Sequence, residues 1–82
     1  MTNLEKYNMI VKRDLKATDA DLNDEVLIYN RFPHWHSVSH VEMVADLEEK
    51  FGVMFSTLDI TSFGKYSLGI EILTKLGVDM TK

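Results

Sequence analysis

The sequence contains no cysteine, a single proline and no long run of apolar residues. Without cysteine, the chain can form neither a disulfide bond nor a cysteine-based zinc site. No apolar stretch approaches the roughly 20 residues that cross a membrane, and MTNLEKYNMIVKRDLK at the start lacks the apolar core of a signal peptide. These absences predict a cytoplasmic location and no insertion into a membrane.

An excess of positive charge is also missing, since nine Lys and Arg stand against thirteen Asp and Glu and give a net charge of −4. A generic nucleic-acid-binding protein carries a basic patch, and none stands out here. An acidic surface instead favours basic protein partners, or serves solubility alone. Nucleic acid is therefore not expected among the partners.

The apolar content of the chain is sufficient for one folded domain. The 82 residues are 45% hydrophobic and 27% charged, which is typical of a globular protein rather than a disordered segment. We expect a single domain over residues 1–82. A domain this small has little room for both a core and a deep substrate pocket, which argues against an enzyme.

Hydrophobic periodicity and turn residues predict three longer helices and one short helix. The first is expected over Leu4–Lys16 with Asn3 as its N-cap. The second is expected over Ser37–Phe51, with Gly52 as its stop signal. Together with the two helices described next, they predict a small all-α four-helix bundle with a long first loop.

The short helix is predicted over Thr57–Ser62, where the S-x-x-D motif that begins one residue earlier resembles a capping box. The last helix is predicted from about Gly64 to Leu76, ended by Gly77. Gly69 inside it costs about 1 kcal/mol relative to alanine. We therefore expect close helix packing at that position.

Residues 17–36 form the long first loop and show no clear periodicity. ATDADLND is rich in turn formers, and VLIY is a short apolar run that would suit a strand, although no partner strand is evident. Long loops in compact domains are often functional or contain a short element. Four apolar side chains are expected to attach this loop to the core: Leu22, Val26, Leu27 and Phe32.

The second helix has a clear core-facing side when its residues are projected at about 100° per residue. The residues on that side are His40, Met43, Val44, Leu47 and Phe51. A narrow acidic strip lies almost opposite and consists of Glu42, Asp46 and Glu49. This pattern is sufficient to bury one side of the helix against a bundle.

A second, smaller apolar patch lies between those two sectors. It consists of Val38, Val41 and Ala45, with Glu48 at its edge. A bundle helix usually needs one apolar stripe. The patch leaves two interpretations open, a wide core face or an apolar seam with acidic edges that docks on a partner groove with basic rims.

Ser37 stands where the second helix begins, at unpaired backbone N–H groups and the positive end of the helix dipole. Such a position suits an anion, and a phosphate ester on Ser37 would lie where those donors point. Serine is also a common helix cap. The position alone therefore leaves a structural role open.

The segment WHSVSHVEMVADLEEKFGV resembles the modification segment of acyl carrier proteins and the related peptidyl carrier domains. In that family a D-S-L motif opens the second helix, and a pattern like V-E-L-V-x-x-L-E-E-x-F follows. Here Ser37 matches the serine, Val38 matches the next aliphatic residue, and HVEMVADLEEKFG matches the rest without a gap. Further on, ITSFGKYSLGIEILTKL looks like the short third helix and the final helix of the family.

The resemblance implies a carrier rather than an enzyme. The serine of the family receives 4′-phosphopantetheine from coenzyme A through a separate phosphopantetheinyl transferase. The thiol of this arm then holds an acyl or aminoacyl group as a thioester. By position the attachment residue is Ser37, flanked by His36 and Val38. Because the chain has no cysteine, a thioester requires such an imported thiol.

Family members bind partner enzymes through acidic and exposed apolar side chains of the second helix. The enzymes implied are acyl-activating enzymes, acyltransferases and ketosynthases of fatty acid, polyketide, lipid or related biosynthesis, and the carrier is expected to be a monomer. By position the contact residues are Val38, Val41, Glu42, Ala45, Glu48 and Glu49. The acyl chain often lies between the helices, which makes Met43, Val44 and Leu47 candidate lining residues besides their core role.

His36 departs from the family pattern, which normally has aspartate before the serine. Histidine titrates at about pH 6.5 and is never an anion. The substitution either demands a dedicated transferase or marks a protein that keeps the carrier fold as an interaction module without an arm. Both interpretations are open, and the departure favours a specialised carrier over a housekeeping one.

The same segment also raises two other chemistries. His34, His36 and His40 lie close in sequence and zinc accepts imidazole, but there is neither an H-E-x-x-H motif nor a cysteine to complete a site. A nucleophilic serine needs an oriented base and an oxyanion hole, and no G-x-S-x-G motif is present. Neither a metal site nor hydrolase chemistry is expected.

Overall fold

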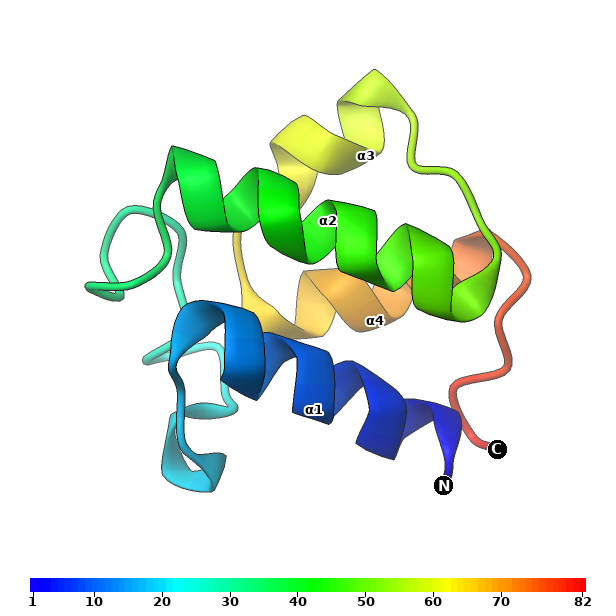
Figure 1. Cartoon of the computed structure of the whole chain (residues 1–82), viewed down its shortest axis with the longest axis horizontal. Coiled ribbons are helices and arrows are strands. Elements are labelled where there is room, and N and C mark those ends of the chain that lie inside the picture. The colour runs from blue at the N-terminus through cyan, green and yellow to red at the C-terminus, as the bar shows by residue number, and fades with distance from the viewer.

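The computed structural model describes residues 1–82 and consists of four α-helices joined by loops, without a sheet (Figure 1). The helices are α1 (Asn3–Leu15), α2 (Ser37–Phe51), α3 (Thr57–Ser62) and α4 (Tyr66–Lys75), and one 3-10 turn, η1, covers Asp19–Asp21. The predicted all-α bundle of three longer helices and one short helix is confirmed. None of these helices combines the length and the apolar character needed to cross a bilayer.

Helix α1 begins and ends close to the predicted positions, but with a different cap. Thr2 is the N-cap, because its hydroxyl accepts from the Glu5 N–H while the Glu5 carboxylate accepts from the Thr2 N–H. The predicted cap, Asn3, instead donates from its side chain to the carbonyl of Asp79. Lys16 adopts a left-handed conformation with φ of 52°, so α1 ends one residue before the predicted end.

Helices α2 and α3 have the predicted bounds because strong local signals set them. Gly52 has φ of 63° and its N–H bonds to the Glu48 carbonyl, which ends α2. Ser56 and Asp59 form the predicted capping box, in which each side chain accepts from the other residue's N–H at 3.0 and 3.1 Å.

Helix α4 begins at Tyr66, two residues after the predicted start, because its cap comes from the first loop. No side chain at the N-cap position, Lys65, bonds to the helix. Instead, Asp24 accepts from the N–H of Ser67 at 2.8 Å and from its hydroxyl at 2.6 Å. The long loop thus fixes where α4 starts.

The core lies between the helices and includes two residues of the first loop. Its buried apolar residues are Tyr7, Ile10, Val11, Leu15, Leu27, Trp35, Met43, Val44, Leu47, Phe55, Phe63, Ile72 and Leu73. The close packing expected at Gly69 is present, since a Cβ there would lie 2.6 Å from Cζ of Phe63 and still closer to the Tyr7 hydroxyl. The neighbours are thus two aromatic side chains, one of which comes from α1.

Three of the four predicted residues attach the first loop to the core, and Trp35 and Tyr29 do so as well. Leu27 is fully buried, and Leu22 and Phe32 pack against the core. Val26 is 40% exposed, so its predicted core role is wrong. The reason is local, because the Asn23 side chain accepts from the N–H groups of residues 25 and 26 and forms a turn that places Val26 outside.

The VLIY run forms no strand, although it pairs with another segment at one point. Ile28 makes an isolated antiparallel bridge with Lys65, and the Tyr29 N–H donates to the Gly64 carbonyl at 3.0 Å. This contact holds the loop beside the start of α4. Figure 1 shows the first loop and the start of α2 at one end of the molecule and both chain termini at the other.

Candidate functional site

Ser37 is the first residue of α2, and its side chain is exposed and makes no hydrogen bond. The N-cap of the helix is His36. The structural role left open by the sequence, in which Ser37 caps the helix, is therefore wrong. A free hydroxyl at a helix start is accessible to a reagent in solution.

Ser39, two residues along, is in the opposite situation. Its side chain is buried, and its hydroxyl donates to the His34 carbonyl at 2.6 Å and accepts from the His36 N–H at 3.0 Å. In return, Nδ1 of His36 accepts from the Ser39 N–H at 3.5 Å. This reciprocal capping box commits Ser39 to the structure and leaves Ser37 free. This capping box was not predictable from the sequence, because the usual acidic third residue is absent.

His40 connects the first loop, α2 and α3 through both ring nitrogens. The Trp35 indole donates to Nδ1 at 2.9 Å, and Nε2 lies 2.8 Å from the Ile60 carbonyl. Because an indole can only donate and a carbonyl can only accept, His40 carries its proton on Nε2. The predicted inward orientation of His40 is confirmed, and its partners hold the loop that precedes Ser37.

Three aromatic rings pack around His40. Trp35 stacks on the imidazole with ring centroids 6.0 Å apart, while Tyr29 and Phe63 approach it at 5.1 and 5.6 Å.

The three histidines do not converge on one point, and no three metal-binding side chains are grouped in the structure. Both nitrogens of His40 are already bonded within the protein.

The second apolar patch on α2 faces solvent. Val38 is 61% exposed, Val41 is 64% exposed and Ala45 is exposed as well. The wide-core interpretation is therefore wrong, and the patch is free to contact another molecule. Met54 and Leu58, in and after the α2–α3 loop, are also exposed and were missed, because this segment is too short to show periodicity.

The core-facing side of α2 is close to its prediction. Four of its five residues are buried: His40, Met43, Val44 and Leu47. Phe51 is only half-buried, because it lies in the last turn, just before the chain leaves the helix at Gly52. The helix register is thus correct, and the predicted burial is too deep at one end.

The acidic residues of α2 divide into free and engaged groups. Glu42 and Glu49 are exposed and form neither an ion pair nor a hydrogen bond. Asp46 pairs with Arg13 of α1 at 3.0 Å. Glu48 accepts from the Phe55 N–H at 2.7 Å, which fixes the α2–α3 loop. Of the predicted acidic contact residues, Glu48 thus has a structural partner within the chain.

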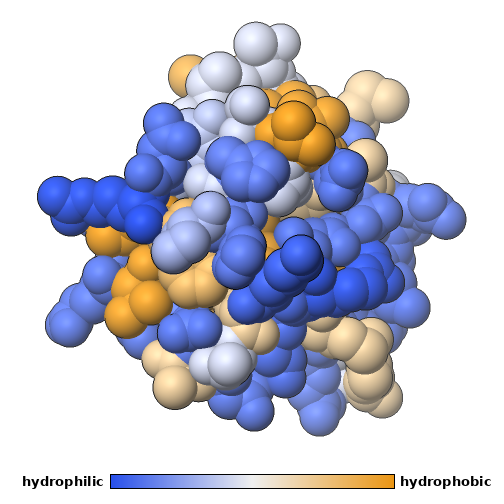
Figure 2. All heavy atoms as spheres, turned by 60° about the vertical axis from the view of Figure 1, so that its left-hand side comes forward, coloured by the Kyte–Doolittle hydropathy of each residue, from blue (hydrophilic) through white to orange (hydrophobic).

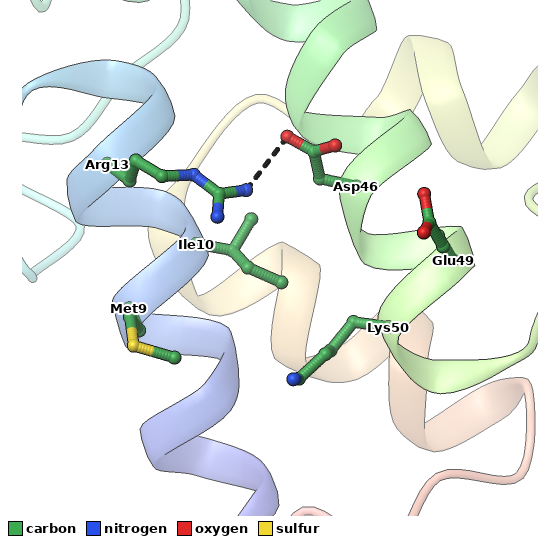
Figure 3. A pocket seen from close by; sticks show the side chains of 6 residues that line it. All are labelled: Met9, Ile10, Arg13, Asp46, Glu49 and Lys50. Atoms are coloured by element: carbon green, nitrogen blue, oxygen red, sulfur yellow. Dashed lines mark hydrogen bonds and ion pairs between the residues drawn. The ribbon is translucent and has the colours of Figure 1, made fainter.

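A cleft of about 330 Å³ lies between α1 and α2 (Figure 3). Its lining residues are Met9, Ile10, Arg13, Asp46, Glu49 and Lys50. Figure 3 shows the Arg13 side chain reaching from α1 to Asp46 on α2. This ion pair occupies one end of the cleft and makes the opening polar.

Asp14 lies beside this pair and carries a buried oxygen without a partner. Its Oδ1 accepts from Arg13 Nε at 3.1 Å, while Oδ2 has no hydrogen bond. Burial, and next the neighbouring carboxylate of Asp46, raise the pKa of Asp14. Ionised Asp14 is therefore a destabilising element between α1 and α2.

No family model, curated protein or solved structure matches this chain. What the site can do is therefore inferred from its own geometry and from the family pattern around Ser37.

A second cleft, of about 470 Å³, lies between α3 and α4. Leu58, Leu68 and Ile72 supply its apolar side, and Asp59 and Lys75 form an ion pair in it. The α2 residues expected to line an acyl chain, Met43, Val44 and Leu47, are buried in the core and line neither cleft.

Proposed function

We propose that this chain is an acyl carrier protein that bears 4′-phosphopantetheine on Ser37 and presents acyl or aminoacyl thioesters to biosynthetic enzymes. The observation that carries the proposal is the free, exposed hydroxyl of Ser37 at the start of α2. It stands at the residue that the family pattern assigns to attachment. The neighbouring Ser39 is bonded and buried, so the two serines are not equivalent.

The residues around Ser37 fit a phosphodiester. The N–H groups of Ser37 and Val38 have no partner inside the helix, whereas those of Ser39 and His40 bond to Nδ1 and to the carbonyl of His36. The positive end of the helix dipole favours an anion there. No carboxylate occurs in the sequence between Glu25 and Glu42 to repel the phosphate. When bound, the arm supplies the thiol that this chain does not have.

The exposed sector of α2 is the proposed docking surface for partner enzymes. Projected at about 100° per residue, Val38, Val41 and Ala45 share this sector with Glu42 and Glu49. Exposed apolar residues next to free carboxylates suit a protein surface with an apolar groove and basic rims. The proposed partners are a phosphopantetheinyl transferase and acyl-activating, acyltransferase or ketosynthase enzymes. The carrier is proposed to bind them as a monomer in the cytoplasm.

Intact-mass spectrometry tests the attachment. The protein is incubated with coenzyme A and a broad-specificity phosphopantetheinyl transferase, and the mass increment of one arm is measured. The increment is expected for the native chain and for Ser62→Ala, which removes another exposed serine, and it should be absent for Ser37→Ala. Circular dichroism of each variant verifies that the helices persist.

A second candidate is an interaction module that has the same fold and no arm. His36 supports it, because this residue replaces the usual aspartate and serves as the helix cap. In that case the exposed patch binds a partner whether or not Ser37 is present. Absence of any mass increment with several transferases, one of them from the same genome, would favour the module over the carrier.

A further inference from the structure

The last part of the loop before α2 carries a positive charge, whereas the unpaired residues further along the helix, Glu42 and Glu49, are negative. Arg31, His34 and His36 are exposed, and Asp and Glu are absent from residues 26–41. The Arg31 guanidinium forms no ion pair or hydrogen bond. A free cation thus precedes Ser37, with no anion near it in the sequence.

The loop that carries Arg31 is held beside the helix start by its own hydrogen bonds. The Asn30 N–H donates to the Trp35 carbonyl at 2.9 Å, and the Trp35 N–H donates to the Phe32 carbonyl at 3.0 Å. Trp35 is in turn fixed to His40 on α2. Arg31 therefore lies in a loop that is closed by the hydrogen bond between Asn30 and Trp35.

The negative charge of the free glutamates begins about one and a half turns into α2. Glu42 is six residues from His36, or about 9 Å along the axis, and Glu49 is a further 10 Å or so away. Both carboxylates are unpaired, whereas Asp46 and Glu48 are engaged within the chain. Val38 and Val41, both more than half exposed, lie between the two charged regions.

The view of this end of the molecule agrees with a polar docking surface. Figure 2 brings the loop side forward and shows a mostly hydrophilic surface on which apolar groups form separate small areas. A partner held by apolar contact alone would need a larger continuous patch. Charge must therefore contribute to recognition here.

We infer that the surface formed by Arg31, His36, Val38, Val41 and Glu42 docks a protein of split polarity. That partner carries a carboxylate opposite Arg31 and His36, an apolar centre over the two valines, and a lysine or arginine opposite Glu42. A uniformly basic surface would meet repulsion from Arg31, which lies in the loop that precedes Ser37. The inference rests on the proposed function, because the partner in question is an enzyme that acts at Ser37.

The first test measures kcat/KM for arm transfer from coenzyme A by a broad-specificity transferase whose docking groove is uniformly basic. Arg31→Glu should raise kcat/KM by about tenfold and Glu42→Lys should lower it by a similar factor, both less so at high salt. Lys82→Glu is the matched control, since it changes charge equally at the end of the molecule far from α2's start, and its effect should be small (Figure 1).

The second test repeats the series with the transferase encoded in the same genome. Here Arg31→Glu should lower kcat/KM by about tenfold, because it breaks a complementary contact. Equal effects of Arg31→Glu and Lys82→Glu with both enzymes would overturn the inference, as would a gain from Arg31→Glu with the cognate enzyme. If neither enzyme modifies the native chain or any variant, the proposed function itself fails, and the inference falls with it.

Discussion

At the scale of single residues, hydrogen bonds within the chain determine which side chains around α2 remain available. Ser37 is free while Ser39 is bonded, and Glu42 is free while Glu48 holds the next loop. The residue type is the same within each pair. The difference arises from backbone groups of loops, which offer their N–H and C=O groups to one member only.

Asp14 is the residue at which we expect a stabilising substitution. The pKa of Asp14 is raised, first by burial, which means that the ionised carboxylate disfavours the folded state. The contribution of Asp14 to stability is therefore most favourable below the unfolded pKa of about 4, and it is lost as pH rises through the folded pKa. Asp14→Asn should therefore increase the free energy of unfolding at pH 7, and the new amide can donate to Asp46.

Urea unfolding at pH 7 and pH 3 checks this expectation. The gain from Asp14→Asn should be present at pH 7 and small or absent at pH 3, where the native carboxyl is itself protonated. Glu49→Gln, which changes an exposed carboxylate of the cleft between α1 and α2, is the matched control and should change little. A loss of stability at pH 7 would contradict the description of Asp14 as a buried, unsatisfied acid.

At the scale of elements, the helices divide by how local their end signals are. The bounds of α2 and α3 follow from Gly52 and from the S-x-x-D motif, which act within a few residues, and both were predictable. The start of α4 was not, since its cap, Asp24, is 43 residues away from Ser67. The prediction that Val26 packs in the core was wrong for a local reason, because a sequence pattern does not show which turn Asn23 closes.

Asp24→Asn should destabilise the protein through the start of α4. The hydrogen bonds from Ser67 lower the pKa of Asp24, so its stabilising effect is present above the unfolded pKa of about 4 and is lost as pH falls through the folded value. The expected loss at pH 7 is at most about 1 kcal/mol, the usual value of a helix cap, reduced by solvent screening.

Thermal melts at pH 7 and at pH 2 measure this effect against a neighbouring control. Glu25→Gln changes an exposed carboxylate that makes no side-chain hydrogen bond, so it should leave the melting temperature unchanged at both values. Asp24→Asn should lower it at pH 7 alone. A melting temperature equal to that of Glu25→Gln would mean that α4 does not depend on the first loop for its cap.

At the scale of the whole molecule, one imidazole joins parts that are distant in the fold. His40 bonds the first loop through Trp35 and α3 through Ile60, and the rings of Tyr29 and Phe63 also lie beside it. The sequence predicted the bundle and the inward direction of His40, and it left open whether the second apolar patch of α2 is exposed. It did not predict this network, because a bond between residues five apart is typical of neither a helix nor a strand.

Trp35→Phe should test how much this network contributes. The substitution keeps an aromatic ring but removes the indole donor, which leaves Nδ1 of His40 buried and unpaired at a cost of about 1–3 kcal/mol, in addition to lost packing. Tyr29→Phe is the control in the same cluster, since the Tyr29 hydroxyl makes no hydrogen bond within the chain. Equal urea midpoints for the two variants would show that the bond contributes nothing.

The two chain termini lie at the end of the molecule opposite to the start of α2 (Figure 1). An affinity tag, a sensor-chip linker or a fluorescent fusion attached at either terminus would therefore leave the Ser37 hydroxyl and the valines beside it facing the bulk solution. Immobilised in this way, the protein could serve directly as bait in surface-based screens for the proposed partners.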